Sequence, residues 1–382
     1  MGNTLRGYRL VVLSALMLLF DGLHLGGFQL AISSASAEFG LGKTGMGLLV
    51  AVQFASIIIT PMISGGLADR FGKKPLLVAG VCCMLAGCLA AGLSHRLLPF
   101  SAGIFLVGSG GIICESVSSA AISDRYPEQS NRYINLCQFF FSSGAIVGPI
   151  LLQAILNRSI PWRALYAILG AAFLLLLWPL LRLHLPRTSA AAASSGNPLR
   201  FLRSPAYALL FISIIAYVGL ENGFGYFAGS LFELGLDAPQ LGAYAISAFW
   251  AGTAISRLVN SVRSPAAPRL VIVYYLSSAA GLLLMALSRN AALSLAVSFL
   301  VGYSYGPIWS ALVAMAAGEF PDQSAGAVGL MSTGCGIGGA LYPVIMGVMA
   351  DHMDIHIPFF LLAATALSGV LLGLLYRRRK RR

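Results

Sequence analysis

Charged residues are scarce in this chain: of its 382 residues, 10% are Asp, Glu, Lys or Arg, whereas 58% are hydrophobic. Soluble domains carry roughly 25% charged residues, and the mean hydropathy of this chain is +0.82. The composition therefore excludes a soluble enzyme, a soluble nucleic-acid-binding protein and a secreted disulfide scaffold. It predicts a polytopic membrane protein, because about 20 consecutive apolar residues are enough to cross a bilayer.

The cysteines form no recognisable pattern. They lie inside apolar segments with neither disulfide nor metal-ligand spacing, and they are Cys82, Cys83, Cys88, Cys114, Cys137 and Cys335. Small packing residues are the simplest interpretation. No nucleophile–base pair or metal-ligand set stands out either. We therefore expect no metal, no cofactor and no enzymatic activity, with a non-transporting solute sensor left as a minor alternative.

Twelve apolar segments of membrane-spanning length can be traced between polar breaks. They lie at about 8–36, 44–66, 76–94, 98–123, 132–156, 162–185, 206–233, 239–261, 270–287, 291–317, 326–351 and 357–376. The Ala35-Ser36-Ala37 sequence in the first segment resembles a signal-peptidase site, but that segment is too long for a leader and contains Asp21. Because twelve is even, we expect both termini on the same side of the membrane.

The distribution of positive charge predicts which side that is. Assigning each Lys and Arg to a connection puts twenty on the side of the termini and five on the other side. By the positive-inside rule, both termini are expected in the cytoplasm of a multi-pass protein of the cell membrane. This bias also accounts for the net charge of +12 without any nucleic-acid partner.

The two halves of the chain repeat each other. Tyr126-Pro127-Glu128-Gln129-Ser130 recurs as Phe320-Pro321-Asp322-Gln323-Ser324, a shift of 194 residues that also maps Gly144 onto Gly338 and Pro149 onto Pro343. A polar linker over 186–205 separates the halves. We therefore predict a six-helix bundle over 1–185 and a second over 206–382 that includes a basic tail. Parallel halves of this kind are typical of transporters.

The loop after the second segment carries a recognisable motif, Gly65-Gly66-Leu67-Ala68-Asp69-Arg70-Phe71-Gly72-Lys73-Lys74. It resembles the signature of the major facilitator superfamily at the position where that family has it. The resemblance implies an all-α membrane fold of twelve transmembrane helices in two pseudo-symmetric bundles. It also implies a role in gating on the inner side for Gly66, Asp69, Arg70 and Gly72. Arg257, at the cytoplasmic end of the eighth segment, is interpreted as a snorkelling or gate residue.

Four ionisable side chains fall within the apolar segments: Asp21, His24, Glu115 and Glu221. A charge at the bilayer centre costs at least about 2.5–3.5 kcal/mol, so such residues usually face a cavity or a partner. Asp21 and His24 are three residues apart and can pair. No cation is obvious near Glu221 in the sequence. All four are candidates for proton coupling, with static structural pairing as the alternative for each and, for Glu221, hydrogen bonding to the substrate as a further one.

Polar and aromatic side chains inside the segments are candidates for contacting a substrate. Amides, hydroxyls and flat aromatic faces suit a neutral polyhydroxylated solute such as a sugar, although any of the aromatics is also explained by packing. The candidates are Gln29, Gln53, Asn135, Gln138, Tyr217, Asn222, Tyr226, Trp250, Tyr305 and Trp309.

Two regions narrow the resemblance to one branch of the superfamily. The stretches around Glu115, Asn135–Phe140 and Gly144–Pro149, and Tyr217–Glu221 with Phe249–Gly252, are similar to the fucose/glucose proton symporters. This implies that Glu115 takes part in proton-coupled sugar uptake. We therefore expect a monomeric carrier whose partners are a small-molecule substrate, protons and the lipid bilayer. A proton antiporter that exports amphipathic drugs is the alternative on the same fold.

Overall fold

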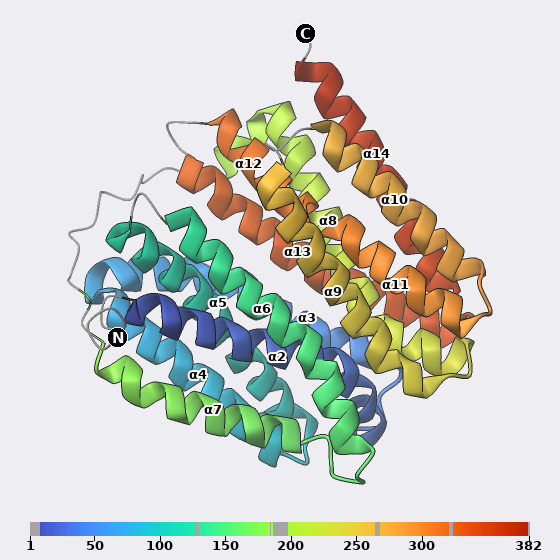
Figure 1. Cartoon of the computed structure of the whole chain (residues 1–382), viewed down its shortest axis with the longest axis horizontal. Helices are drawn as coiled ribbons and strands as arrows, with labels where there is room; N and C mark the ends of the chain where they lie inside the picture. Colours follow the sequence, from blue (N-terminus) through green and yellow to red (C-terminus); the bar gives the residue numbers. More distant parts are fainter. Residues whose placement is uncertain are drawn as a thin grey trace. The chain divides into compact units, whose positions relative to one another are not determined.

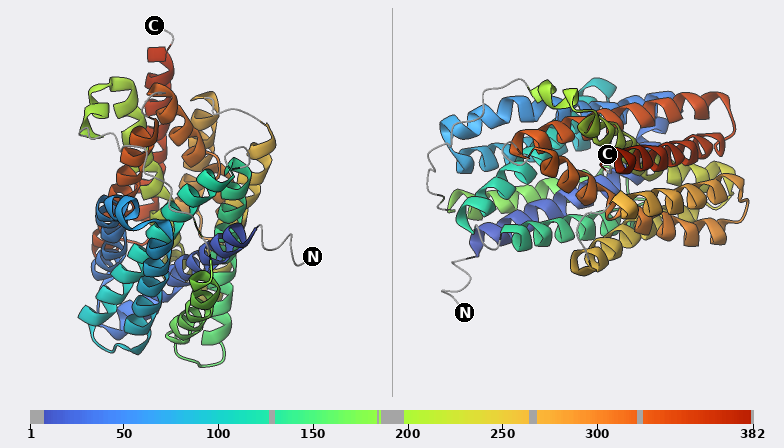
Figure 2. Two further views of the ribbon diagram at one scale, coloured as in Figure 1. Left: turned by 90° about the vertical axis from the view of Figure 1, so that its left-hand side faces the viewer. Right: turned by 90° about the horizontal axis from the view of Figure 1, so that it is seen from above.

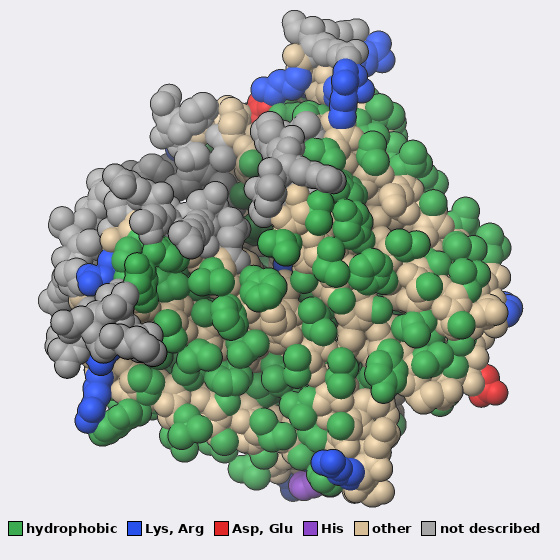
Figure 3. Space-filling view, viewed as in Figure 1, with side chains coloured by type: hydrophobic (Ala, Val, Ile, Leu, Met, Phe, Trp, Pro, Cys, Tyr) green, Lys and Arg blue, Asp and Glu red, His purple; other side chains and the backbone are tan. Residues whose placement is uncertain are grey.

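The computed structural model describes residues 8–126, 130–183, 185, 198–263, 268–320 and 324–380, and all regular structure in these ranges is helical. Within these described ranges, ten helices are long and apolar enough to cross a membrane. On the face shown in Figure 3, hydrophobic side chains predominate, and the Lys and Arg side chains lie at the margins. An all-helical membrane protein is therefore confirmed.

The helices follow the predicted segments closely (Figure 1). Those in the first half of the chain are α2 (Arg9–Glu38), α3 (Lys43–Phe71), α4 (Lys73–Leu93), α5 (Leu97–Arg125), α6 (Ser130–Leu156) and α7 (Ala164–Leu181). Those in the second half are η2 (Pro198–Arg203), α8 (Pro205–Ser230), η3 (Leu231–Gly235), α9 (Pro239–Arg263), α10 (Pro268–Leu287), α11 (Ala291–Tyr305), α12 (Ile308–Glu319), α13 (Ser324–His352) and α14 (Ile357–Lys380).

The tenth predicted segment differs from the sequence-based expectation. It forms two shorter helices, α11 and α12, which are separated at Gly306 and Pro307. Proline has no N–H group to donate to the preceding turn, and its ring clashes with the carbonyl four residues earlier. The break lies beside Arg257 of α9, whose Nε atom donates a hydrogen bond to the Gly306 carbonyl.

The helices fall into two compact units. The first comprises residues 1–31 and 52–191, and the second comprises residues 32–51 and 192–382. In the first unit α4 packs against α5 and α7, and in the second α8 packs against α13 and α14 while α10 packs against α14. Figure 2 shows α10 and α14 running side by side. The predicted division at a linker over 186–205 stays a prediction, since residues 186–197 lie outside the described part of the chain.

The internal repeat is visible in the packing of each unit. A Cβ added at Gly144 of α6 would collide with the Leu19 carbonyl of α2, and one added at Gly338 of α13 would collide with the Ile215 carbonyl of α8. Small residues let helix backbones approach this closely in membrane proteins. The proline at the equivalent position of each helix, Pro149 or Pro343, lies inside it. Residues related by the shift of 194 therefore occupy equivalent positions.

Enlarging either glycine should push these helix pairs apart. We expect Gly144→Val and Gly338→Val each to destabilise the protein by about 1–3 kcal/mol, as overpacking typically does. Thermal unfolding of the detergent-solubilised protein measures the effect. Gly329→Ala is the matched control, because nothing lies within 4 Å of a Cβ at that position of α13. Equal melting temperatures for all three variants would contradict the packing described here.

Candidate functional site

Two acidic side chains meet within the first unit. Asp21 of α2 lies over the backbone of α5 at Gly111, where an added Cβ would be 2.7 Å from the Asp21 Oδ1 atom. Glu115 follows Gly111 by one helical turn on α5, and its charge acts on Asp21. The glycine therefore makes room for the carboxyl group of Asp21, which is why two acidic groups can share this part of the unit.

A third helix contributes an amide to this pair. The Gln138 Nε2 atom of α6 donates a hydrogen bond of 2.8 Å to the Glu115 Oε1 atom. Asp21 makes no hydrogen bond or salt bridge with any other described residue. Helices α2, α5 and α6 thus bring together Asp21, Glu115 and Gln138, three of the predicted site residues, and we call these three residues the carboxylate cluster.

His24 does not join the carboxylate cluster, so the expected Asp21–His24 pair is not formed. His24 is fully buried, its ring stacks on Phe28 at 5.7 Å, and it meets the edge of Tyr166 at 5.9 Å. Neither of its ring nitrogens has a hydrogen-bond partner among the described residues. Residues three apart on a helix differ in direction by about 60°. Asp21 therefore faces α5, whereas His24 faces α7.

Glu221 has a cation partner that the sequence did not reveal. The Glu221 Oε1 atom accepts a hydrogen bond of 2.8 Å from the Tyr217 hydroxyl group and lies 3.8 Å from the Arg257 guanidinium. The Arg257 Nε atom also donates to the Gly306 carbonyl at 3.4 Å, next to the break between α11 and α12. Arg257 therefore bridges helices inside the second unit, and its role as a snorkelling or gate residue stays a prediction.

Several predicted aromatic residues gather around this ion pair. Tyr217 meets Tyr305 at a centroid distance of 6.0 Å, and Tyr305 meets Phe249 at 5.4 Å. Trp250 packs edge-on against Phe249 at 5.6 Å. Tyr217, Trp250 and Tyr305 are all buried. We define the aromatic–ionic cluster of the second unit as the following six residues: Tyr217, Phe249, Trp250, Tyr305, Glu221 and Arg257.

Other predicted substrate contacts are placed differently. The Asn222 amide donates to the Val218 carbonyl of its own helix at 3.0 Å, and Tyr226 is fully buried. Trp309 is 39% exposed. Gln29 and Gln53 are buried on α2 and α3.

The inner-loop motif is described only in part. The surroundings of Gly66, Asp69 and Arg70 lie outside the described part of the structure. The same holds for Asn135 of α6, which was predicted as a substrate contact. Gly72 has a φ of 90°, a backbone conformation that glycine adopts without strain, and it immediately precedes α4.

The last two residues of this motif, Lys73 and Lys74, make contacts that the sequence did not reveal. The Lys73 Nζ atom donates to the Ala120 carbonyl at 3.2 Å, and the Lys74 Nζ atom donates to the Leu181 carbonyl at 2.7 Å. Both carbonyl groups lie near the C-terminal ends of helices, where a positive charge also stabilises the helix dipole. The local sequence does not indicate these contacts, because each lysine binds the end of a helix that is distant in the chain.

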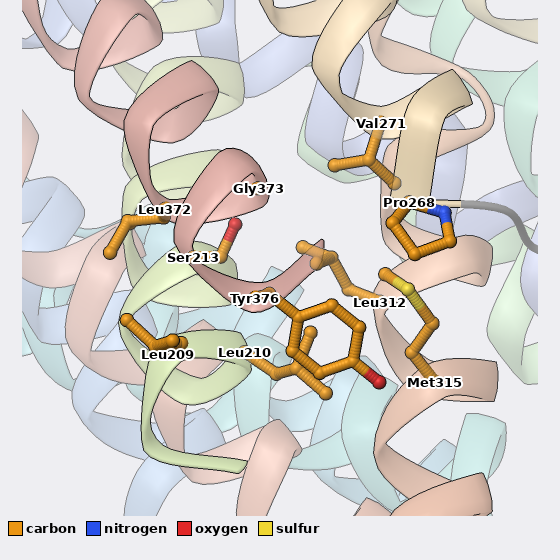
Figure 4. A pocket seen from close by; sticks show the side chains of 10 residues that line it. All are labelled: Leu209, Leu210, Ser213, Pro268, Val271, Leu312, Met315, Leu372, Gly373 and Tyr376. Atoms are coloured by element: carbon orange, nitrogen blue, oxygen red, sulfur yellow. The ribbon is translucent and has the colours of Figure 1, made fainter. Parts of the chain in front are cut away.

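The second unit also contains a crevice that holds none of the predicted site residues. Figure 4 shows it between α8, α10, α12 and α14, with Leu210, Leu312 and Met315 among its apolar walls. Its polar side chains are Ser213 and Tyr376. No group of three or more His, Cys, Asp or Glu side chains that could hold a metal ion occurs among the described residues.

Comparison with a family model identifies the chain. The model of the Major Facilitator Superfamily matches residues 14–265 and 263–382. The chain belongs to the Major Facilitator Superfamily. It is therefore a membrane transporter rather than an enzyme.

Solved structures of this superfamily show the same fold. The nucleoside transporter NupG superposes with a TM-score of 0.80 at 12% identity, covering 97% of this chain and 99% of that one. A bacterial homolog of the human lysosomal transporter Spinster, in an inward-facing and occupied conformation, superposes with a TM-score of 0.75 at 14% identity over 96% of both chains. At these identities the likeness concerns the fold alone.

Curated relatives in sequence carry different names. A TsgA homolog of Edwardsiella ictaluri is 24% identical over 339 residues, 86% of this chain and 82% of that protein. The multidrug resistance protein MdtH of Shigella dysenteriae is 30% identical over 162 residues, 41% of this chain and 39% of that protein. MdtH of Salmonella typhimurium is 38% identical over 93 residues, 23% of its length. The match to MdtH thus spans well under half of that relative.

Removing Arg257 should leave the Glu221 carboxylate without its cation. We expect Arg257→Met to destabilise the transporter by about 1–3 kcal/mol, because the Glu221 carboxylate then loses the positive charge of Arg257. The double variant Arg257→Met with Glu221→Gln should recover part of that loss, since neither charge remains. Melting temperatures in one detergent measure the effect. The exposed Arg96→Met is the control, and a double variant less stable than Arg257→Met would show that the pair is not coupled.

Proposed function

We propose that this transporter couples the uptake of a small polar solute, such as a sugar, to the entry of protons. The observation that carries the proposal is the carboxylate cluster, because an acidic side chain in a membrane is costly when it is charged. A carboxyl group that gains and loses a proton during the cycle is uncharged in its protonated state, and in that state the cost is absent. The cluster thus supports a site for reversible proton loading.

The three residues of the carboxylate cluster are given separate roles in this proposal. Glu115 exchanges the coupled proton, and Asp21 acts on it through their mutual charge interaction. The Gln138 amide holds the Glu115 carboxyl in place through its hydrogen bond of 2.8 Å. The placement of the three residues on three helices and the polar partner of Glu115 are what favour this assignment over a static contact.

The aromatic–ionic cluster supports a polar solute in this proposal. Aromatic faces beside a hydroxyl group and a neutralised ion pair suit a ligand with many hydroxyl groups, which stacks and hydrogen-bonds at once. Tyr217 already donates to Glu221, and Arg257 offsets its charge. The resemblance of the segments around Glu115 and Tyr217 to the fucose/glucose symporters supports the same class.

A second candidate function is proton-coupled export of amphipathic compounds. The similarity to MdtH, a protein named for multidrug resistance, favours it. In this reading the carboxylate cluster carries the counter-proton instead of the co-transported one.

The direction of coupling separates the two functions. In proteoliposomes, a panel of radiolabelled sugars and lipophilic cations is tested under pH gradients of each sign. We expect a sugar to accumulate in the compartment toward which protons flow. Accumulation of a lipophilic cation against the proton flow, with no sugar transported, would overturn the symport proposal in favour of export.

Glu115→Gln should uncouple the carrier from protons. We expect it to abolish accumulation driven by a pH gradient while substrate exchange between equal pools continues, because the amide keeps the size of the side chain but binds no proton. Asp237→Asn is the control, since Asp237 is an exposed loop residue whose backbone tolerates asparagine at its φ of 48°. A Glu115→Gln variant with unchanged gradient-driven accumulation would refute the role of Glu115.

A further inference from the structure

The apolar crevice of the second unit (Figure 4) lies close to one set of helix ends. Leu210 and Ser213 are near the start of α8, and Pro268 is the first residue of α10. Met315 and Tyr376 are near the ends of α12 and α14. The charge distribution predicts that these helix ends face the cytoplasm. An apolar recess near a membrane surface suits a hydrocarbon chain better than a polar solute.

Helices α10 and α14 pack antiparallel beside this crevice. A Cβ added at Gly369 of α14 would lie 2.6 Å from the Tyr275 Cδ1 atom of α10, and one added at Gly373 would lie 2.7 Å from the Ile272 Cγ1 atom. The contact thus moves forward along α14 while it moves back along α10, by about one helical turn in each. This register indicates which residues meet in the next turn.

The next turn carries a basic residue on each helix. The register places Arg377 of α14 beside Arg269 of α10. These two arginines directly follow Tyr376 and Pro268, which line the crevice. Arg269 is exposed and Arg377 is half-buried. Two positive charges from different helices therefore flank the mouth of the crevice, where their mutual repulsion is relieved by an anion.

The end of α14 is held against α12 by an acidic residue. The Glu319 Oε1 atom accepts a hydrogen bond of 2.7 Å from the Tyr376 hydroxyl and lies 2.7 Å from the Lys380 Nζ atom. The last turn of α14 also carries Arg378 and Arg379, and Figure 3 shows Lys and Arg side chains at this end, next to a hydrophobic surface. Glu319 is the one acidic residue in the described helices α10, α12 and α14. The mouth of the crevice is therefore positively charged.

We propose that this crevice and the arginines at its mouth form a binding site for an anionic phospholipid of the cytoplasmic leaflet. The phosphate group lies between Arg269 and Arg377, and one acyl chain enters the crevice between Val271 and Leu372. Guanidinium groups suit this role because they bind phosphate oxygens through two parallel hydrogen bonds. Each basic residue near the surface strengthens the binding of an anionic lipid about 5-fold. The cationic headgroup of a zwitterionic phospholipid is repelled at the same place.

Photo-cross-linking of the purified full-length protein in detergent locates and quantifies the lipid. The probe is phosphatidylglycerol with a diazirine in one acyl chain, and mass spectrometry identifies the labelled peptides. We expect label on the lining residues of α10 and α14, with unlabelled phosphatidylglycerol as an effective competitor and phosphatidylcholine as a poor one. Equal competition by the two lipids, or label confined to other helices, would contradict the site.

Removing the two arginines tests the headgroup contact. We expect the double variant Arg269→Gln, Arg377→Gln to bind the probe about 25-fold more weakly, since two contributions of about 5-fold are lost. The double variant Arg200→Gln, Arg203→Gln is the matched control, because it removes two exposed charges from η2 in the same unit. An equal loss in both double variants would show general attraction to an anionic surface and would overturn the proposal. If the first double variant folds poorly, Arg269→Gln alone is measured, with an expected loss of about 5-fold.

Filling the crevice tests the acyl-chain contact separately. Leu372→Trp should weaken binding about 4-fold for each methylene group that it excludes, although both arginines remain. Leu371→Trp is the control, because Leu371 is exposed and does not line the crevice. Unchanged labelling of the crevice in Leu372→Trp would contradict the proposal. These measurements use neither a transported solute nor a pH gradient, so their outcome is independent of the proposed symport.

Discussion

The cost of placing an ionisable side chain in hydrocarbon is the constraint on which this account depends. A membrane protein keeps such a residue when it has a partner, a polar cavity or a function that needs it. Asp21, Glu115 and Glu221 are ionisable residues of this kind in the described helices. The described partners of these acidic residues differ between the two units, and we propose that the two units have different roles in transport.

Among the contacts that the structure describes, Glu115 of the first unit binds an amide and Glu221 of the second lies beside an opposite charge. In the carboxylate cluster, Gly111 gives space to Asp21 and the Gln138 amide binds Glu115. In the aromatic–ionic cluster, Glu221 faces Arg257 and Tyr217. A carboxylate held by an amide is freer to change its protonation than one held by a guanidinium. We therefore propose proton exchange in the first unit and solute contact in the second.

The fold could be predicted from the sequence because hydrophobic length and internal repetition are local signals. The shift of 194 residues pairs Gly144 with Gly338, and both meet a backbone carbonyl at equivalent places. The break of the tenth segment at Pro307 was missed, because the hydropathy stays high across it although the proline interrupts the helix.

The site was only partly predictable, since its partners come from helices that are distant in sequence. Spacing alone suggested an Asp21–His24 pair, but the two side chains face different neighbouring helices. The same limit hid the partnership of Glu221 with Arg257. Asp21, Glu115 and Gln138 were each selected for polarity inside an apolar segment, and the structure brings them together.

Infrared difference spectroscopy of the reconstituted protein tests the central claim without knowledge of the solute. Protonated carboxyl groups have a C=O stretch that is separate from the bands of carboxylates and amides. The account predicts a protonated-carboxyl band that titrates with pH in the unsubstituted protein and is lost in the Asp21→Asn, Glu115→Gln double variant. An identical band in both proteins, or no titrating band in either, would contradict the assignment of reversible proton loading to the carboxylate cluster.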